Sequence, residues 1–152
     1  MVSIHLALTA PINPPSATPV LTHSQVWAGL ARKARRPQDF VTVVDTCEIL
    51  SEIGNAITAI VTFKPGVAHA RSIKEVCTLR APCRLDYEIE DGSTAVNVIS
   101  VGPSRQEEDL LLTFVFGWEH PELVKGSEAA KRVEENHWKV SLKFIFGGTV
   151  LT

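Results

Sequence analysis

Between residues 41 and 120 the chain is a succession of strand-like runs separated by short connections. Within the runs, apolar and β-branched residues tend to alternate with polar ones, as in strands that bury one face. Gly54-Asn55 and Asp91-Gly92 tolerate the positive φ of tight hairpins. The runs are 41–50, 56–64, 71–80, 83–90, 93–101 and 110–120. Their order predicts an antiparallel meander with one apolar face to cover.

Residues 127–146 change to a helical period. Most charged side chains fall outside one narrow stripe, which holds Ala130, Val133, His137, Val140 and Phe144. Gly147 and Gly148 follow, and glycine commonly ends a helix. We expect a long amphipathic helix that covers the apolar face of the sheet.

A shorter helix precedes the meander, after a first strand near the N-terminus and a proline-rich connection. Thr22 and Gln25 have the spacing of a capping box, and Pro37 marks the end of the helix. Trp27 lies on its apolar side and is expected to shape the interior. The basic cluster is interpreted as its solvent-exposed face. This cluster consists of Arg32, Lys33, Arg35 and Arg36.

Composition narrows the class of protein. The 152 residues suit one domain, predicted to span 1–152. A net charge of −2 gives no electrostatic footprint for nucleic acid or an anionic membrane. The three cysteines lack close metal-ligand spacing, and no basic leader or membrane-spanning apolar run is visible. We expect a soluble cytoplasmic protein that binds neither nucleic acid nor membrane; whether it forms a homodimer stays open.

Three stretches carry a family resemblance: "PINPPSATPVLTHSQVWAGL", its continuation "ARKARRPQDFV", and "FVFGWEHPE". With the element order and the glutamate-rich second strand, they resemble the START and Bet v 1-like (SRPBCC) superfamily, and within it the small fungal family named after AtaL of acetylaranotin biosynthesis. The resemblance implies an α+β helix-grip fold, in which a curved antiparallel sheet of about seven strands wraps around a long C-terminal helix, with two short helices after the first strand. It also implies an apolar cavity that takes lipids, sterols, polyketides or similar molecules.

His137 is the candidate catalytic residue, because it lies in the middle of the apolar stripe of the last helix. An imidazole there could move a proton near neutral pH, as enolisation, dehydration or ring closure requires. A buried histidine with satisfied hydrogen bonds is the alternative, and both interpretations stay open.

The expected ligand-binding residues are Trp27, Glu75, Tyr87, Asn97, Phe116 and Trp118. Phe116 and Trp118 share one face of a strand and predict an aromatic wall. Gly117 between them could carry a bulge that turns Trp118 toward the cavity or away from it. Glu119 and His120 precede Pro121 and are expected to be exposed loop residues.

The other three polar candidates are less determined. Tyr87 is expected to be buried with its strand neighbours. The alternation does not decide which face of its strand holds Asn97. Glu75 is either a buried acid with a raised pKa or an edge charge, and the edge charge is favoured.

No dinucleotide, nucleotide, esterase or zinc-protease motif is present, so we expect no cofactor and no metal. The leading hypothesis is a protein that binds a polyketide-like intermediate of fungal secondary metabolism. It would promote cyclisation, isomerisation or dehydration by holding the reacting atoms in near-attack geometry. A non-catalytic carrier of an apolar ligand is the alternative, and a protein-interaction module is a third reading.

Overall fold

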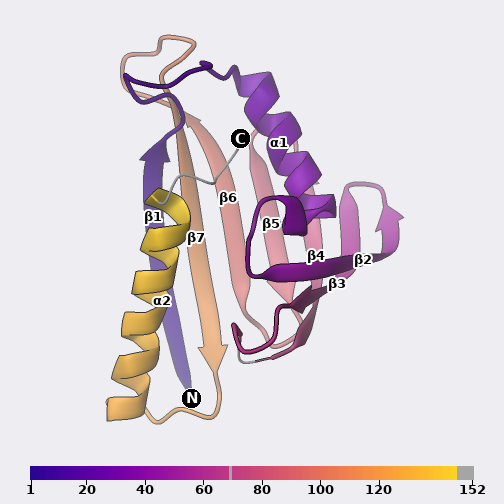
Figure 1. Ribbon diagram of the computed structural model, residues 1–152, viewed down its shortest axis with the longest axis vertical. Coiled ribbons are helices and arrows are strands. Elements are labelled where there is room, and N and C mark those ends of the chain that lie inside the picture. Colours follow the sequence, from indigo (N-terminus) through magenta and orange to yellow (C-terminus); the bar gives the residue numbers. More distant parts are fainter. Residues whose placement is uncertain (69, 147–152) are drawn as a thin grey trace.

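The computed structural model describes residues 1–68 and 70–146, with side chains described up to residue 143 (Figure 1). The elements are β1 (Val2–Pro11), α1 (His23–Arg35), the 3-10 helix η1 (Pro37–Asp39), β2 (Val44–Ile53), β3 (Ala56–Phe63), β4 (Ser72–Arg80), β5 (Arg84–Ile89), β6 (Thr94–Val101), β7 (Leu110–His120) and α2 (Glu128–Phe146). Gly147 and Gly148, expected to end the last helix, lie outside the described residues.

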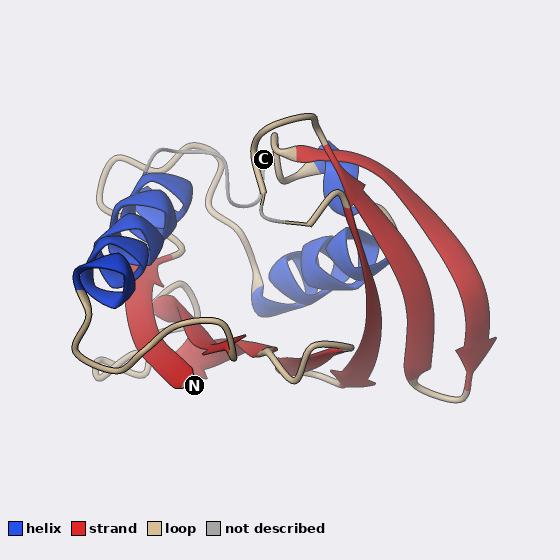
Figure 2. Cartoon of the chain, turned by 90° about the horizontal axis from the view of Figure 1, so that it is seen from below, coloured by secondary structure: helices blue, strands red, loops and turns tan. Residues whose placement is uncertain are grey.

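The strands form one antiparallel sheet of seven strands, in the order β1-β7-β6-β5-β4-β3-β2. The first strand therefore pairs with the last, and β1 and β2 are the sheet edges. The sheet is curved, and both α1 and α2 lie on its concave side (Figure 2). This arrangement confirms the predicted α+β helix-grip fold.

The local signals act as expected. Thr22 and Gln25 form the capping box: the Gln25 N–H donates to Thr22 Oγ1 at 3.2 Å, and the Thr22 N–H donates to Gln25 Oε1 at 2.9 Å. Helix α1 ends at Arg35, and Pro37 opens η1. The two predicted hairpin glycines adopt positive φ, +60° at Gly54 and +91° at Gly92. Glycine takes this conformation without a steric penalty.

The apolar core lies between α1 and the sheet. Val26, Leu30 and Ala34 of α1 are buried against strand residues. These strand residues are Ile57, Cys77, Leu85, Ile99, Leu112 and Phe114. Full burial of one such large apolar side chain stabilises the fold by about 1.5–3 kcal/mol.

Lys33 contradicts the prediction that the basic cluster of α1 is a solvent-exposed face. Only 9 % of its surface is exposed, whereas the side chains of Arg32 and Arg36 are 63 % and 59 % exposed. Lys33 follows Leu30 by three positions and Val26 by seven, so it shares their side of the helix. Its charge was the reason for expecting exposure, but its helical position turns it toward the sheet.

Helix α2 lies along the β1 side of the sheet rather than across its middle (Figure 1). Ala130 and Ser141 are buried, but Val140 is 56 % exposed, so its predicted burial is wrong. The rest of the concave face is not covered by α2. The side chain of Phe144, also predicted for the stripe, lies outside the described part of the chain.

Candidate active site

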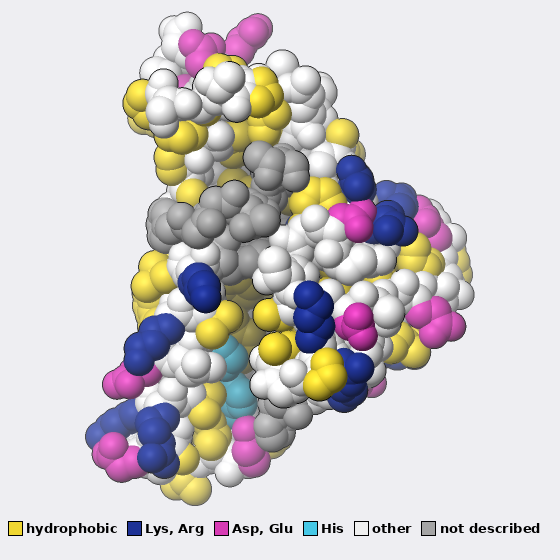
Figure 3. All heavy atoms as spheres, in the orientation of Figure 1, with side chains coloured by type: hydrophobic (Ala, Val, Ile, Leu, Met, Phe, Trp, Pro, Cys, Tyr) yellow, Lys and Arg dark blue, Asp and Glu magenta, His cyan; other side chains and the backbone are white. Residues whose placement is uncertain are grey.

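A cavity of about 710 Å³ lies between the sheet, α2 and the segment that follows α1. This volume is in the range of small-molecule pockets, about 300–1,000 Å³. Apolar side chains make up most of its wall, among them Phe40, Val44, Val61, Phe63, Ile73, Ile89 and Phe114. The surface is hollowed beside α2, where apolar and histidine side chains are visible in the groove (Figure 3). The cavity can therefore take an apolar molecule from outside.

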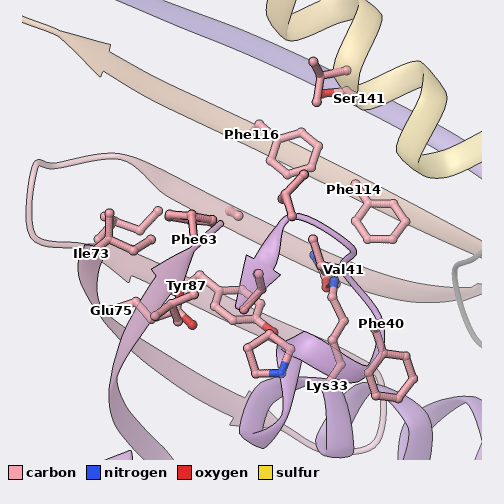
Figure 4. Close-up of a pocket in the computed structure, with 18 of the residues that line it drawn as sticks. Lys33, Phe40, Val41, Phe63, Ile73, Glu75, Tyr87, Phe114, Phe116 and Ser141 are labelled. Atoms are coloured by element: carbon pink, nitrogen blue, oxygen red, sulfur yellow. Dashed lines mark hydrogen bonds between the residues drawn. The ribbon is translucent and has the colours of Figure 1, made fainter. Parts of the chain in front are cut away.

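A small polar cluster interrupts this apolar lining. It consists of Lys33 of α1, Glu75 of β4, Tyr87 of β5 and Asn97 of β6. Lys33 extends from α1 into the cavity, and Glu75 and Tyr87 reach it from the sheet (Figure 4). The structure thus brings together three of the predicted ligand-binding residues and adds Lys33. We call these four residues the polar floor.

The amine of Lys33 is held at two sides. Its Nζ donates to Asn97 Oδ1 at 3.0 Å, and it lies 5.1 Å from the centroid of the Phe114 ring, a cation–π contact. Burial lowers the pKa of Lys33 to about 8, while the nearby carboxyl of Glu75 acts in the opposite direction. The amine therefore exchanges a proton close to neutral pH.

Glu75 is a cavity residue, and the favoured interpretation as an edge charge is wrong. Strand β4 lies between β3 and β5, so it has no free edge. Burial raises the pKa of Glu75 to about 7, and the charge of Lys33 opposes this rise. Glu75 can thus serve as an acid or as a base near pH 7.

Tyr87 and Asn97 have defined places on the floor. Asn97 is 2 % exposed and lines the cavity together with Ala95 from the same face of β6, which settles the face that the alternation left open. Burial raises the pKa of Tyr87 well above its usual value, and that of the Cys77 thiol beside it to about 12. Both groups keep their protons at neutral pH, so Tyr87 can donate a hydrogen bond to a ligand oxygen.

Aromatic side chains form a continuous stack along β7 toward α2. The ring centroids of Phe114 and Phe116 are 6.2 Å apart, and those of Phe116 and Trp118 are 4.9 Å apart. The pairing with β1 and β6 continues without a register shift at Gly117, so this residue carries no bulge. Phe116 and Trp118 both line the cavity, as expected of one strand face.

His137 lies at the far end of this stack, on α2. Its ring stacks on Trp118 at 3.9 Å between centroids, and its Nε2 is 2.9 Å from Nε2 of His120. Burial is the main reason that the pKa of His137 falls to about 4, and the charge of His120 adds to the effect. His137 is not among the described residues that line the cavity. The structure therefore separates it from the polar floor.

Glu119 and His120 are not the exposed loop residues that Pro121 indicated. Both belong to β7, because β1 continues to pair with this strand as far as His120. The Ser3 hydroxyl donates to Glu119 Oε2 at 2.6 Å, and His120 Nδ1 lies 3.0 Å from Glu122 Oε1. Pairing with β1 thus extends β7 past the point where the sequence signals a loop.

Trp27 takes a different place from the one predicted. It packs against the core between α1 and the sheet, and it is not among the described residues that line the cavity. Its position disfavours direct contact with a ligand there. Lys33 is the cavity residue that the sequence pattern did not single out, although its spacing from Val26 and Leu30 was a signal that could have found it.

Residues 1–68 and 70–146 contain no group of three or more His, Cys, Asp or Glu residues that could hold a metal ion. No helix within these ranges combines the length and the apolar composition needed to cross a membrane.

Comparison with known proteins identifies a family to which the sequence is similar and solved structures that share the fold of this chain. The family model described as "Acetylaranotin biosynthesis cluster protein L" matches residues 6–148. The protein of that name from Aspergillus terreus is 27 % identical over 142 residues, which cover 92 % of this chain and 81 % of that protein.

Three solved structures share the fold over 97 % of this chain. The Zhui aromatase/cyclase from Streptomyces sp. R1128 has a TM-score of 0.63 at 17 % identity, with 94 % of that chain covered. The di-domain ARO/CYC StfQ from the steffimycin biosynthetic pathway has a TM-score of 0.63 at 11 % identity, with 51 % of that chain covered. TTHA0849 from Thermus thermophilus has a TM-score of 0.61 at 10 % identity, with 94 % covered.

Proposed function

The chain belongs to the family of acetylaranotin biosynthesis cluster protein L, and we propose from this premise that it acts on an intermediate of fungal secondary metabolism. The intermediate would be an apolar, polyketide-like molecule bound in the cavity. The protein would promote its cyclisation, isomerisation or dehydration without a cofactor. Two proteins of the same fold that are named aromatase/cyclase support this class of reaction.

The observation that carries the proposal is the polar floor within an apolar cavity. The apolar walls supply affinity and exclude water from the ligand. The polar floor brings an amine, a carboxyl group and a phenol into the wall of one cavity that is large enough for a small molecule. Glu75, with its pKa near 7, would move the proton, and Tyr87 would donate a hydrogen bond to the oxygen that gains charge.

His137 stays a second candidate for the acid or base. With a pKa of about 4 its ring is neutral at pH 7 and can accept a proton. It would have to act at the Trp118 end of the cavity, because Trp118 separates it from the floor. The position of Glu75 on the cavity wall favours Glu75.

A non-catalytic carrier is the second function that the cavity supports. The same apolar lining would bind and release a ligand without changing it. In either case we expect a small-molecule ligand rather than nucleic acid or membrane. The free thiols of Cys47, Cys77 and Cys83 fit a reducing cytoplasmic location.

Ligand capture distinguishes the two functions. The purified protein is incubated with an extract of a polyketide-producing fungus, and native mass spectrometry detects the complex before the ligand is released and identified. A bound species that returns chemically altered supports the enzyme, whereas one that returns unchanged supports the carrier. Absence of any bound small molecule would contradict both.

Two glutamate variants sharpen this experiment. Glu75→Gln should still bind the species but return it unaltered, because the amide cannot exchange the proton. Glu88→Gln is the matched control, since Glu88 is exposed on the next strand and does not line the cavity. It should process the ligand as the wild-type protein does.

A further inference from the structure

Lys33 is an unusual residue to find in the wall of an apolar cavity. A buried ammonium group loses its hydration, which costs free energy unless other groups compensate. A neutral side chain of similar size, such as methionine, would fill this position on α1 at no such cost. The amine therefore calls for an explanation beyond packing.

The surroundings hold the amine at the cavity surface. Asn97 Oδ1 accepts one of its N–H bonds at 3.0 Å, and the Phe114 ring lies 5.1 Å away. Both contacts fix the end of a side chain that is otherwise flexible. Lys33 also lines the cavity, so a ligand bound there meets a positioned amine.

We propose that Lys33 is a nucleophile that condenses with a ketone or aldehyde carbonyl of the bound ligand to form an imine. The inference rests on the proposed function and narrows the ligand to an apolar molecule with a reactive carbonyl group. Polyketide-like molecules of the kind proposed above carry such groups along their chain.

The chemistry balances without an external reagent. The amine nitrogen adds to the carbonyl carbon, the oxygen becomes a hydroxyl group, and this group leaves as water when the C=N bond forms. Glu75 in its acid form gives the proton to the departing hydroxyl. As a carboxylate it then takes a proton from the neighbouring carbon, and the resulting enamine attacks a second carbonyl of the same ligand. Water finally hydrolyses the C=N bond and restores the amine.

The electrostatic setting supports this role. Burial lowers the pKa of Lys33 to about 8, so a useful fraction of the amine is neutral and nucleophilic near neutral pH. The titratable groups around it are Glu75 and Cys77 of β4, Tyr87 of β5 and, on the wall of the same cavity, Lys143 of α2. Cys77 and Tyr87 keep their protons, which leaves Glu75 as the neighbour whose charge changes near pH 7.

A β-diketone with an apolar end tests the inference directly. 1-Phenylbutane-1,3-dione condenses with a neutral amine, loses one water and gives an enaminone that survives denaturation. The intact wild-type protein is incubated with this probe, weighed by mass spectrometry and digested for peptide mapping. We expect one adduct per chain, of the diketone mass less one water, located on Lys33. Its rate should rise about tenfold per pH unit below pH 8 and level off above.

Variants give the matched controls. Lys33→Met should form no adduct, and Lys33→Arg, which keeps the positive charge but has no primary amine, should form no enaminone. Lys131→Met removes an exposed lysine of α2 that does not line the cavity and should react as the wild-type protein does. Because peptide mapping locates the adduct in the wild-type chain, the result does not depend on the folding of any variant.

The possible outcomes distinguish a failure of the imine hypothesis from a failure of the proposed function. An adduct absent from Lys33, or spread over exposed lysines such as Lys131, would overturn the imine. If such a protein still altered a ligand from the fungal extract, the proposed function would stand without it. An adduct on Lys33 in a protein that binds nothing from the extract would support the nucleophile and contradict the proposed function.

Discussion

The amine of Lys33 and the side-chain oxygen of Asn97 lie 3.0 Å apart across the cavity floor, although 64 positions separate them in the chain. This hydrogen bond favours the charged form of Lys33, so the residue at position 97 should tune its pKa. Asn97→Leu should lower the pH midpoint of the diketone reaction by about one unit, and Asn97→Asp should raise it by about as much. Rates measured from pH 6 to 10 check both. Shifts in the same direction would contradict the role of Asn97.

Glu75 should make the wild-type protein less stable as the pH rises through neutrality. Its pKa is about 7 when folded and close to its ordinary value of 4.5 when unfolded, so the folded state binds the proton more tightly. The stabilisation is complete below pH 4.5 and is lost as the pH rises to about 7, a change of about 3 kcal/mol. Denaturant titrations of Glu75→Gln should lack this loss. Glu88→Gln should keep it, and a parallel profile for both variants would refute the assignment.

His137 should have the opposite effect at acid pH. Its pKa falls from 6.5 to about 4 on folding, so the unfolded state binds the proton more tightly between these values. Stability is therefore lost as the pH falls from 6.5 to 4, by ~1 kcal/mol for this half-exposed ring. His137→Phe preserves the stacking on Trp118 and removes the titration. Thermal melts at pH 7 and pH 4.5 should show a smaller difference for this variant than for the wild type.

Phe116 should contribute to ligand affinity more than to folding. It lines the cavity in a stack with Trp118 and is only partly buried. Phe116→Ala should weaken binding of an apolar fluorescent probe about tenfold, because roughly 1.5 kcal/mol of apolar contact is removed. Displacement titrations measure the change. Unchanged affinity would show that the probe binds elsewhere.

Trp27 should contribute to folding stability more than to ligand affinity. Its side chain packs against the core and not on the cavity, so Trp27→Ala should reduce the free energy of unfolding by about 3 kcal/mol. The affinity for the same probe, measured where the variant is folded, should stay within about twofold of the wild type. A large loss of affinity would restore the original hypothesis that Trp27 contacts the ligand.

The sequence predicted the strands well because local signals determine them. Gly54 and Gly92 sit at hairpins, and the alternation around Tyr87 marks one buried face. The capping box at Thr22 and Pro37 bracketed α1 correctly. Each of these features depends on neighbours in the chain, which is why a single sequence contains enough information to find it.

The parts of the site that were missed depend on tertiary contacts. Lys33 can be buried because Asn97 and Phe114 lie opposite it and contact its amine. The expectation that charged residues lie at the surface takes no account of such tertiary contacts. The inward face of Glu75 was visible in the alternation, but whether it meets solvent depends on where the helices lie. His120 belongs to β7 because Val2, near the N-terminus, pairs with it as part of β1.

The cavity draws its floor and the wall formed by the last helix from different parts of the chain. The amine and the carboxyl group come from α1 and β4, whereas Val140 and Ser141 line the cavity from α2. Substitutions on α2 can therefore alter which molecules fit without displacing the reactive groups. A family built in this way can diversify its substrates by drift in the last helix alone, and exchanging that helix between relatives offers an engineering route to new specificities.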